Sequence, residues 1–557
     1  MKKGLFMLLL LWAFPVHAQV GSCEPAMAEA YLDAGNVRAR ILNNGSLFWR
    51  RSPQQISSLG YEVPKGSGLH AMGTASLWVG GIMDAELRTA ATRYGPWEFW
   101  AGPLDKAGNA PAHCKPYDHI WEIRTEDIQA FLNGEGTSEN LKNWPWQLGA
   151  PVIDGDGNPD NYDLEHGDLP ELLGDQRLWW IMNDAGGIHQ ATGSNAIGLE
   201  IQASAFAIKN PPWSHFTFYS YALINKNVST LEDTYAGLFT NGDLGYFGDD
   251  YVGSDSLLHL GFYYNADNED EGYRGYGDAP PAIGLTFLHT PIKDDDNRDN
   301  DRDGIIDEPG EMLGTTNTMA FDSDPGPYGD PTDADHYYAY MQSTWGNGRH
   351  VVEGYRGIQG DYWPKGLIAQ HTNFFYPGDP VTGAFWSENN MDGMGNRVHP
   401  SDRLFVVATG PFNLAPGDTT VINFAIIWSR GDSNLNSISV LRRETRAVRA
   451  NADYIYTPTA VMKSLANQQA PLLGFDQNFP NPFSQSTTLR YSLPQTMQVR
   501  LAVYDILGRE VALLVDAQQE AGIYTAEFDA DNLPAGIYLA RIELDFLQFT
   551  KRMVLIR

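Results

Sequence analysis

Alternating apolar and polar residues recur along the first 470 positions of the chain, and they predict β-strands. The alternation is clean over residues 199–205, and bulkier side chains alternate over 216–222. Because successive side chains of a strand point to opposite faces, a period of two is typical of strands that pack against a core. A third such run, over 421–428, follows a Pro-Gly turn.

An early hairpin is indicated at residues 37–49. Val37, Ala39 and Ile41 alternate with arginines as far as Asn44-Gly45, and a second apolar run follows. Asn-Gly tolerates the positive φ angles that a tight hairpin turn requires.

Helices are predicted at few places. Leu435, Ile438, Leu441 and Val448 fall on one face of a helix between residues 432 and 456. Shorter helices are expected over residues 125–132 and 138–144. The fold class is therefore mainly β: residues 19–470 form a β-sandwich-like body of one or two subdomains, with long Asp-, Gly- and Pro-rich loops and few helices.

The N-terminus has the pattern of a secretory signal peptide. Two lysines precede a short apolar run over residues 5–14, and Ala18 supplies the small residue at the cleavage position. We therefore expect residues 1–18 to be a signal peptide, with a lipoprotein signal that attaches lipid to Cys23 as the alternative. No later stretch is long and apolar enough to predict a transmembrane span.

Charge and cysteine content limit the classes of partner that the protein can bind and the cellular compartment in which it can fold. The 557 residues include 38 Lys and Arg against 69 Asp and Glu, a net charge of −31. Such a surface repels phosphate backbones, so nucleic acid is excluded as a partner and cations are favoured. Cys23 and Cys114 are the two cysteines. In an oxidising compartment we expect them to form a disulfide, with two separate thiols as the alternative.

The last ninety residues form a second unit. Short alternating blocks separated by turns predict a small antiparallel β-sandwich. Val499, Leu501 and Val503 share one face of a strand there, while Arg500 and Tyr504 share the other.

Four motifs in this unit resemble a known family. They are Asn478-Phe479-Pro480-Asn481-Pro482-Phe483, the run over 503–511, Leu533-Pro534-Ala535-Gly536-Ile537-Tyr538, and the basic and apolar end at 551–557. Together they resemble the type A C-terminal sorting domain of type IX secretion cargo, over about residues 472–557. An ordinary Ig-like domain without a sorting role is the alternative.

The resemblance implies that residues 471–557 are an Ig-like β-sandwich that the outer-membrane type IX translocon reads. The protein would then be secreted or displayed on the cell surface. The sorting domain would be removed after export or exchanged for a lipopolysaccharide anchor.

Segments of the body also look like parts of large uncharacterised secreted proteins that carry the same sorting domain. These segments cover residues 117–121, 149–157, 174–180, 249–255 and 410–418. The resemblance implies export and carries no activity with it.

An aspartate-rich loop near residue 300 predicts a calcium site. Asp299, Asp301 and Asp303 occupy alternate positions before Gly304, and oxygens on alternate residues of a tight turn converge on one cation. Gly310 stands where a complete calcium loop has a bidentate glutamate. The rest of the shell would come from Asp307, Glu308, Glu311 or the aspartates at 294–296. A solvated acidic loop is the alternative.

A second calcium loop is predicted from residue 154. Oxygen-bearing side chains recur at Asp154, Asp156, Asn158 and Asp160, and Glu165 falls at the position of the bidentate ligand. Pro159 replaces the usual glycine, so an Asx turn cluster is the alternative. Asp243, Asp249, Asp250 and Asp255 form a looser third group.

No nucleophile elbow, zinc motif or phosphate-binding loop occurs, and no catalytic residue is predicted. We expect an exported, calcium-stabilised protein with a structural, adhesive or ligand-binding role, and surface glycans or lipopolysaccharide as partners. The alternative is a secreted polysaccharide-active hydrolase, because this export route commonly carries such enzymes. Two carboxylates about 5–10 Å apart in an aromatic-lined cleft would favour the hydrolase.

Overall fold

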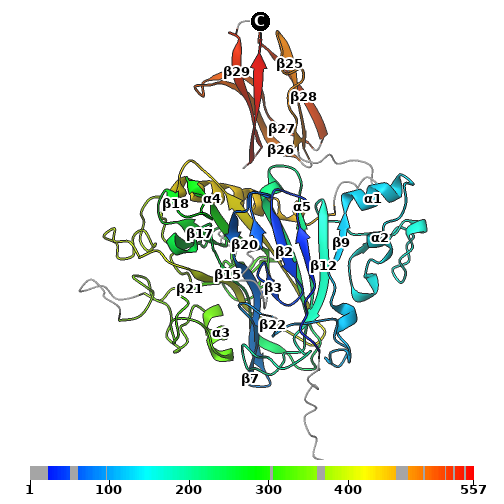
Figure 1. Ribbon diagram of the computed structural model, residues 1–557, viewed down its shortest axis with the longest axis vertical. Coiled ribbons are helices and arrows are strands. Elements are labelled where there is room, and N and C mark those ends of the chain that lie inside the picture. Colours follow the sequence, from blue (N-terminus) through cyan, green and yellow to red (C-terminus); the bar gives the residue numbers. More distant parts are fainter. Residues whose placement is uncertain are drawn as a thin grey trace, which may run out of the picture.

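The computed structural model confirms a mainly β fold with few helices (Figure 1). It describes residues 23–50, 60–95, 97–300, 305–360, 370–458, 474–493, 496–520, 522–530, 533–544 and 547–556. The predicted signal peptide, residues 1–18, lies outside the described residues.

Two large antiparallel sheets make up the body. The first sheet runs β21 (Asn317–Phe321), β22 (Leu404–Leu414), β15 (Leu231–Asn241), β6 (Thr74–Met83), β3 (Ser46–Leu47), β2 (Arg38–Leu42), β4 (Tyr61–Glu62) and β5 (His70–Met72), with β1 (Glu29–Leu32) on β2 and β7 (Glu86–Ala91) on β6. The second sheet runs β16 (Asp250–Asp255), β17 (Leu260–Asn265), β20 (Ala282–His289), β23 (Thr419–Ser429), β14 (Phe216–Asn225), β13 (Leu199–Ala207), β12 (Gln176–Asn183) and β8 (Trp100–Ala101), with β9 (Trp121–Arg124) on β12. The three strands predicted by alternation are thus neighbours in the second sheet.

Shorter elements decorate these sheets. Two small hairpins pair β10 (Val152–Ile153) with β11 (Leu169–Pro170) and β18 (Glu269–Asp270) with β19 (Gly277–Asp278). The α-helices are α1 (Thr125–Leu132), α2 (Glu139–Lys142), α3 (Ala334–Met341), α4 (Asn434–Ala450) and α5 (Ala452–Ile455), and single 3₁₀ turns lie at Lys115–Tyr117, Trp146–Leu148, Leu164–His166, Trp213–His215 and Phe247–Asp249.

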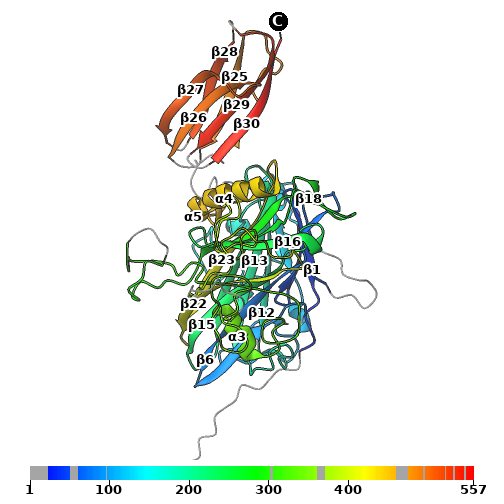
Figure 2. The same ribbon diagram turned by 90° about the vertical axis from the view of Figure 1, so that its left-hand side faces the viewer.

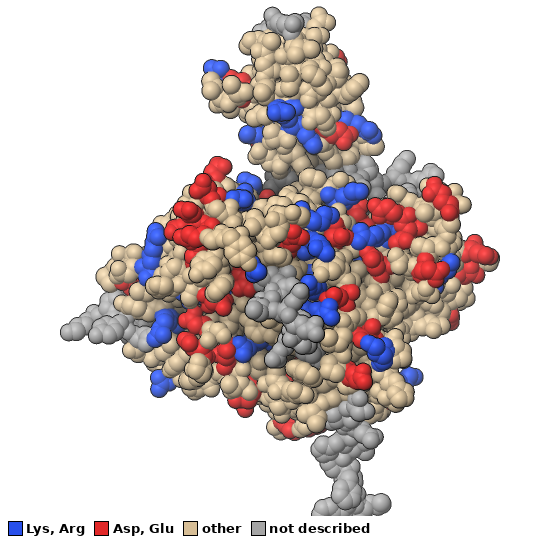
Figure 3. Space-filling model, in the orientation of Figure 1, with Lys and Arg blue, Asp and Glu red and all other residues tan. Residues whose placement is uncertain are grey.

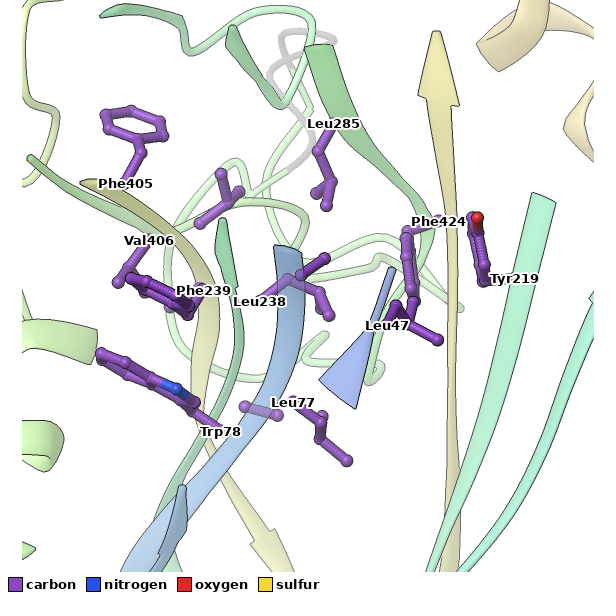
Figure 4. Packing of buried hydrophobic residues seen from close by; sticks show 14 of the residues in the cluster. Leu47, Leu77, Trp78, Tyr219, Leu238, Phe239, Leu285, Phe405, Val406 and Phe424 are labelled. Carbon is purple, nitrogen blue, oxygen red and sulfur yellow. The ribbon is translucent and has the colours of Figure 1, made fainter. Parts of the chain in front are cut away.

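The inner faces of the two large sheets bury one apolar core (Figure 4). Phe48, beyond β3, meets Tyr219 of the second sheet edge to face at 6.5 Å, and Tyr219 stacks on Phe424 at 4.7 Å. Both sheets are also covered on their outer faces. Trp78 of β6 contacts Tyr337 of α3 at 4.7 Å, and α4 packs on β17, β20 and β23. Most central strands are therefore buried on both sides.

The helix predicted over residues 432–456 is split. Ser433 caps the N-terminus of α4 by accepting a hydrogen bond from the Asn436 N–H. At the other end, the Asn451 side-chain amide donates to the Ala447 carbonyl at 2.8 Å and competes with the backbone bonds that would continue the helix. The chain bends there and restarts as α5.

The C-terminal strands form two small sheets of their own (Figures 1 and 2). One contains β24 (Gly474–Phe475), β25 (Ser486–Leu493) and β28 (Gly522–Asp529), and the other contains β27 (Glu510–Gln519), β26 (Met497–Asp505), β29 (Gly536–Leu544) and β30 (Leu547–Leu555). Val499, Leu501 and Val503 are fully buried, and Arg500 donates to the Tyr504 hydroxyl at 2.8 Å. The predicted faces of this strand are confirmed.

Cys23 and Cys114 form a disulfide, with Cα atoms 5.4 Å apart and a sequence separation of 91. The expected pairing is confirmed. It ties the first described residue of the chain to the loop before β9.

Removing this bridge should destabilise the body. Closing a loop of this length restricts the unfolded chain, so replacing both cysteines by serine should lower the free energy of unfolding by about 2–4 kcal/mol. Denaturant unfolding followed by tryptophan fluorescence measures the change. An unchanged free energy would contradict this role for the bridge.

Candidate functional site

The pairing of β15 with β22 brings two distant carboxylates to one sheet edge. Asn241, the last residue of β15, lies opposite Leu404, the first residue of β22. Asp243 follows β15 by two residues and Asp402 precedes β22 by two, and the charge of Asp402 acts on Asp243. These residues are far apart in sequence, and only the sheet makes them neighbours.

Asp243 and Asp402 line a cavity of about 820 Å³. Five aromatic side chains line it as well: Trp49, Tyr94, Tyr246, Phe247 and Tyr273. Asn241 and Arg274 complete its polar lining, and Gly245 and Gly272 contribute backbone. We call this site the Asp243 cavity.

The aromatic side chains stand at two depths. Trp49 and Tyr94 meet edge to face at 5.4 Å, and Tyr94 also packs on Phe239 of the core at 5.8 Å. Tyr273 is 88% exposed, and the Arg274 guanidinium lies 5.3 Å from its ring centroid. The cavity therefore has an aromatic wall anchored in the core and an exposed aromatic residue at its mouth.

The two carboxylates differ in their electrostatic surroundings. Burial raises the pKa of Asp243 to about 7, with a further rise from the negative charge of Asp402 and a smaller opposing effect from Arg274. Burial and the negative charge of Asp322 also raise the pKa of Asp402, and the positive charge of Arg403 only partly opposes this rise. Near neutral pH Asp243 can therefore carry a proton.

Asp243 is held in a strained and crowded position. Its φ is 41°, in the left-handed region that few non-glycine residues adopt. A Cβ atom on Gly73 would lie 2.2 Å from Asp243 Oδ2, so only glycine allows this close approach. The Gly73 N–H donates to the Asn241 carbonyl at 3.0 Å and fixes the two segments together. Backbone strain of this kind is concentrated at functional sites.

Several polar atoms of the cavity wall have no hydrogen-bond partner among the described residues. They are Asn241 Oδ1, Asp402 Oδ1 and Trp49 Nε1, and each is buried. The Asn241 side chain is only 7% exposed, and its amide donates to the Tyr94 hydroxyl at 3.2 Å. Buried polar groups are normally paired, so these three atoms lack the partner that such groups usually have.

The fold brings three aspartates of the looser third group together and places the fourth elsewhere. Asp243, Asp249 and Asp250 do approach one another, and the charges of the other two add to the burial that raises the pKa of Asp250. Asp255 instead forms an ion pair with Arg442 at 3.0 Å. Asp270, which the sequence pattern did not include, joins the group from the β18–β19 hairpin.

A second cavity, of about 930 Å³, lies next to the segment that carries Asp402. Ser401 and Arg403 line this cavity. Arg403 is buried and forms ion pairs with Asp322 at 2.5 Å and Glu388 at 2.7 Å. Its charge is therefore balanced within the protein.

The predicted loop from residue 154 is a candidate metal centre. Asp154, Asp156 and Asp168 each offer a carboxylate oxygen, and these atoms all lie within 4.8 Å of one another. The β10–β11 hairpin pairs Ile153 with Leu169, so the register places Asp154 beside Asp168. Among the described residues, no other group of His, Cys, Asp and Glu meets this distance.

The remaining predicted ligands of this loop take other places. The Asn158 N–H donates to Asp156 at 2.8 Å and to Asp154 at 3.1 Å, while Asp160 and Glu165 are exposed outside the cluster. Asp168 was missed because the calcium-loop spacing ends at residue 165. Its position directly before an apolar strand was the available signal.

The predicted loop near residue 300 is described only in part. Asp301 and Asp303 lie outside the described residues. The Asp307 carboxylate accepts the Asp296 and Asn297 N–H groups at 2.9–3.0 Å. Asp299, Asp307 and Glu308 do not join a group of three closely spaced ligands in the described part of this loop.

Residues 477–556 match the family described as the secretion system C-terminal sorting domain. These residues therefore form a type IX secretion sorting domain. Type IX cargo is exported, so this protein is secreted or displayed at the cell surface. In the part of the chain that the structure describes, no helix is both long and apolar enough to cross a membrane. Acidic side chains are spread over the visible face of the exported body (Figure 3).

Among solved structures, the chain matches a polysaccharide lyase with 8% identity and a TM-score of 0.17. The match covers 64% of this chain and 34% of the lyase. A TM-score this low shows no shared architecture. The comparison with curated proteins found no match.

The raised pKa of Asp243 predicts a pH-dependent stability. Its ordinary pKa is 3.8, so between about pH 4 and 7 the folded state binds more protons than the unfolded state, and stability falls as pH rises. The substitution Asp243→Asn removes this loss of stability, because the asparagine side chain does not ionise. The full shift corresponds to about 4 kcal/mol, and partial exposure reduces the expected gain above pH 7 to about 1–2 kcal/mol.

Urea unfolding at pH 4 and pH 8 measures this effect. The exposed Asp278, replaced by Asn, is the matched control and should show no such pH-dependent gain. Equal stability of Asp243→Asn and the parent protein at pH 8 would mean that Asp243 is not held in an unfavourable environment.

Proposed function

We propose that the exported body is a ligand-binding protein and that it binds glycan in the Asp243 cavity. The aromatic lining around two carboxylates is the observation that carries this proposal. Sugar rings present apolar C–H faces that pack on aromatic rings, and their hydroxyl groups form hydrogen bonds with carboxylates and amides. The cavity offers both kinds of surface.

The volume and the unpartnered polar atoms support the same ligand class. About 820 Å³ is within the range of small-ligand sites and accommodates several sugar units. Asn241 Oδ1 and Asp402 Oδ1 accept hydrogen bonds, and Trp49 Nε1 donates one. Sugar hydroxyls can both donate and accept hydrogen bonds, so they could pair with all three atoms.

Calcium is proposed as a structural ion of the body. Asp154, Asp156 and Asp168 supply hard oxygen ligands of the type that calcium prefers. Asn161 donates to Asp156 at 2.9 Å, and its own Oδ1 is buried without a hydrogen-bond partner among the described residues. This oxygen is available as a further ligand. The loop from Asp299 to Glu308 remains a second predicted calcium site.

The proposed export route of the body depends on one segment near each end of the chain. We propose that residues 1–18 direct the chain across the inner membrane and that residues 472–557 are read by the type IX translocon. The body would then meet surface glycans or lipopolysaccharide outside the cell, where millimolar calcium is common.

Glycan binding should depend on the exposed aromatic residue at the cavity mouth. Tyr273→Ala removes a ring that can stack on a sugar, so it should weaken binding about tenfold or more. Calorimetric titration with hexasaccharides of glucan, xylan, mannan and galacturonan measures the affinity. Phe479→Ala removes a ring that is 81% exposed outside the cavity and should leave affinity unchanged. Equal loss in both variants, or no binding by the parent, would contradict the proposal.

Calcium should bind and stabilise the folded body. Extracellular sites have dissociation constants of 10⁻⁴–10⁻³ M, so 1 mM calcium should add about 0.4–1.4 kcal/mol per site. Asp156→Asn should abolish one binding event in a calcium titration, while Asp160→Asn is the control and should retain it. Asp301→Ala combined with Asp303→Ala tests the second loop in the same way. A titration without binding heat, and melting unaffected by chelator, would refute the calcium proposal.

A further inference from the structure

We propose that the Asp243 cavity is also a catalytic site that hydrolyses a glycosidic bond of the glycan it binds. Asp243 is the general acid and Asp402 is the general base. This inference rests on the proposed glycan binding, and it adds a reaction and two catalytic residues.

The positions of the two carboxylates are the first support. Asp243 follows β15 by two residues and Asp402 precedes β22 by two, so both leave the same end of this strand pair and line the same cavity. The two carboxyls are near enough for the negative charge of Asp402 to raise the pKa of Asp243. Paired carboxylates of glycosidases are about 5–10 Å apart.

The cavity wall around the pair is the second, independent support. Asn241 is 93% buried, and its Oδ1 has no hydrogen-bond partner among the described residues. Asn241 lies two residues before Asp243 and lines the same cavity. An unpaired buried acceptor beside a carboxylate pair marks a place where a ligand hydroxyl would bind.

The charged groups around each carboxyl indicate which one acts as the general acid and which as the general base. The charged and titratable groups that face Asp243 are Asp402, Asp250, Arg274 and Tyr94. Two of these are acidic, and with burial they favour the protonated form of Asp243. Burial and the negative charge of Asp322 raise the pKa of Asp402 as well, and the positive charge of Arg403 opposes this rise. Because two neighbouring carboxyls oppose each other's ionisation, Asp243 keeps a proton more readily when Asp402 is ionised, and acid–base hydrolysis requires one protonated and one ionised carboxyl.

The reaction balances with water as its only co-reactant. Asp243 donates its proton to the glycosidic oxygen as the bond from that oxygen to the anomeric carbon breaks, and the bond's electron pair stays on the oxygen. A water molecule attacks the anomeric carbon and gives a proton to the Asp402 carboxylate. Transfer of that proton to Asp243 through solvent restores the starting state. One water is consumed and one reducing end is formed.

The test measures binding and hydrolysis with the same hexasaccharides. The full chain is titrated calorimetrically, and reducing ends are then followed over time. We expect hydrolysis of a bound hexasaccharide, with kcat reduced at least 100-fold in Asp243→Asn and in Asp402→Asn while affinity changes less than threefold. Asp278→Asn, an exposed acid outside the cavity, should retain full activity.

The pH profile separates a catalytic from a structural role. Activity should fall above about pH 7 as Asp243 loses its proton, and melting curves confirm that the variants are folded. Binding without formation of reducing ends would overturn the inference and leave the proposed function standing. Absence of binding would overturn both. Variants that are folded and fully active would overturn the assignment of these two residues.

Discussion

The antiparallel register between β15 and β22 is the constraint on which the cavity depends. Both strands lie in the middle of a sheet that is covered on both faces, with α3 on one side and the second sheet on the other. Slipping the pairing by one residue would exchange the faces of every side chain in the strand. Burial on both faces therefore fixes the register, and the register brings the segments that carry Asp243 and Asp402 out at the same end of the two strands.

The large apolar core offsets the unfavourable free energy of the strained and polar groups at the cavity. A raised pKa, a left-handed aspartate and unpartnered buried atoms each destabilise the folded state. Aromatic contacts such as Tyr219 on Phe424 and Trp78 on Phe239 hold the strands that lead into the site (Figure 4). Loops at the end of such a framework can carry strained polar groups without loss of the fold.

The local elements could be predicted from the sequence because their signals are short-range. Alternation predicted the strands that became β13, β14 and β23, and the helix over residues 125–132 was placed correctly. Asn44-Gly45 predicted the turn between β2 and β3, in which Ile41 pairs with Leu47. The sorting domain was recognisable from its motifs because they are contiguous.

The candidate sites could be predicted only in part, because they depend on pairing between distant strands. Asp154 and Asp156 were found from their spacing, whereas Asp168 required knowledge of the β10–β11 register. Asp243 was noted among neighbouring aspartates, but Asp402 gives no local signal beyond preceding a strand. No pattern in residues 231–241 identifies 404–414 as their partner, so the cavity could not be predicted from the chain alone.

A crystal structure of the exported body with a bound hexasaccharide tests the central claim most directly. The account predicts sugar density in the Asp243 cavity, with one ring against Tyr273 and a glycosidic oxygen within hydrogen-bond distance of Asp243. Sugar bound only in the cavity lined by Arg403, or an Asp243 cavity that stays free of sugar at saturating concentration, would contradict it.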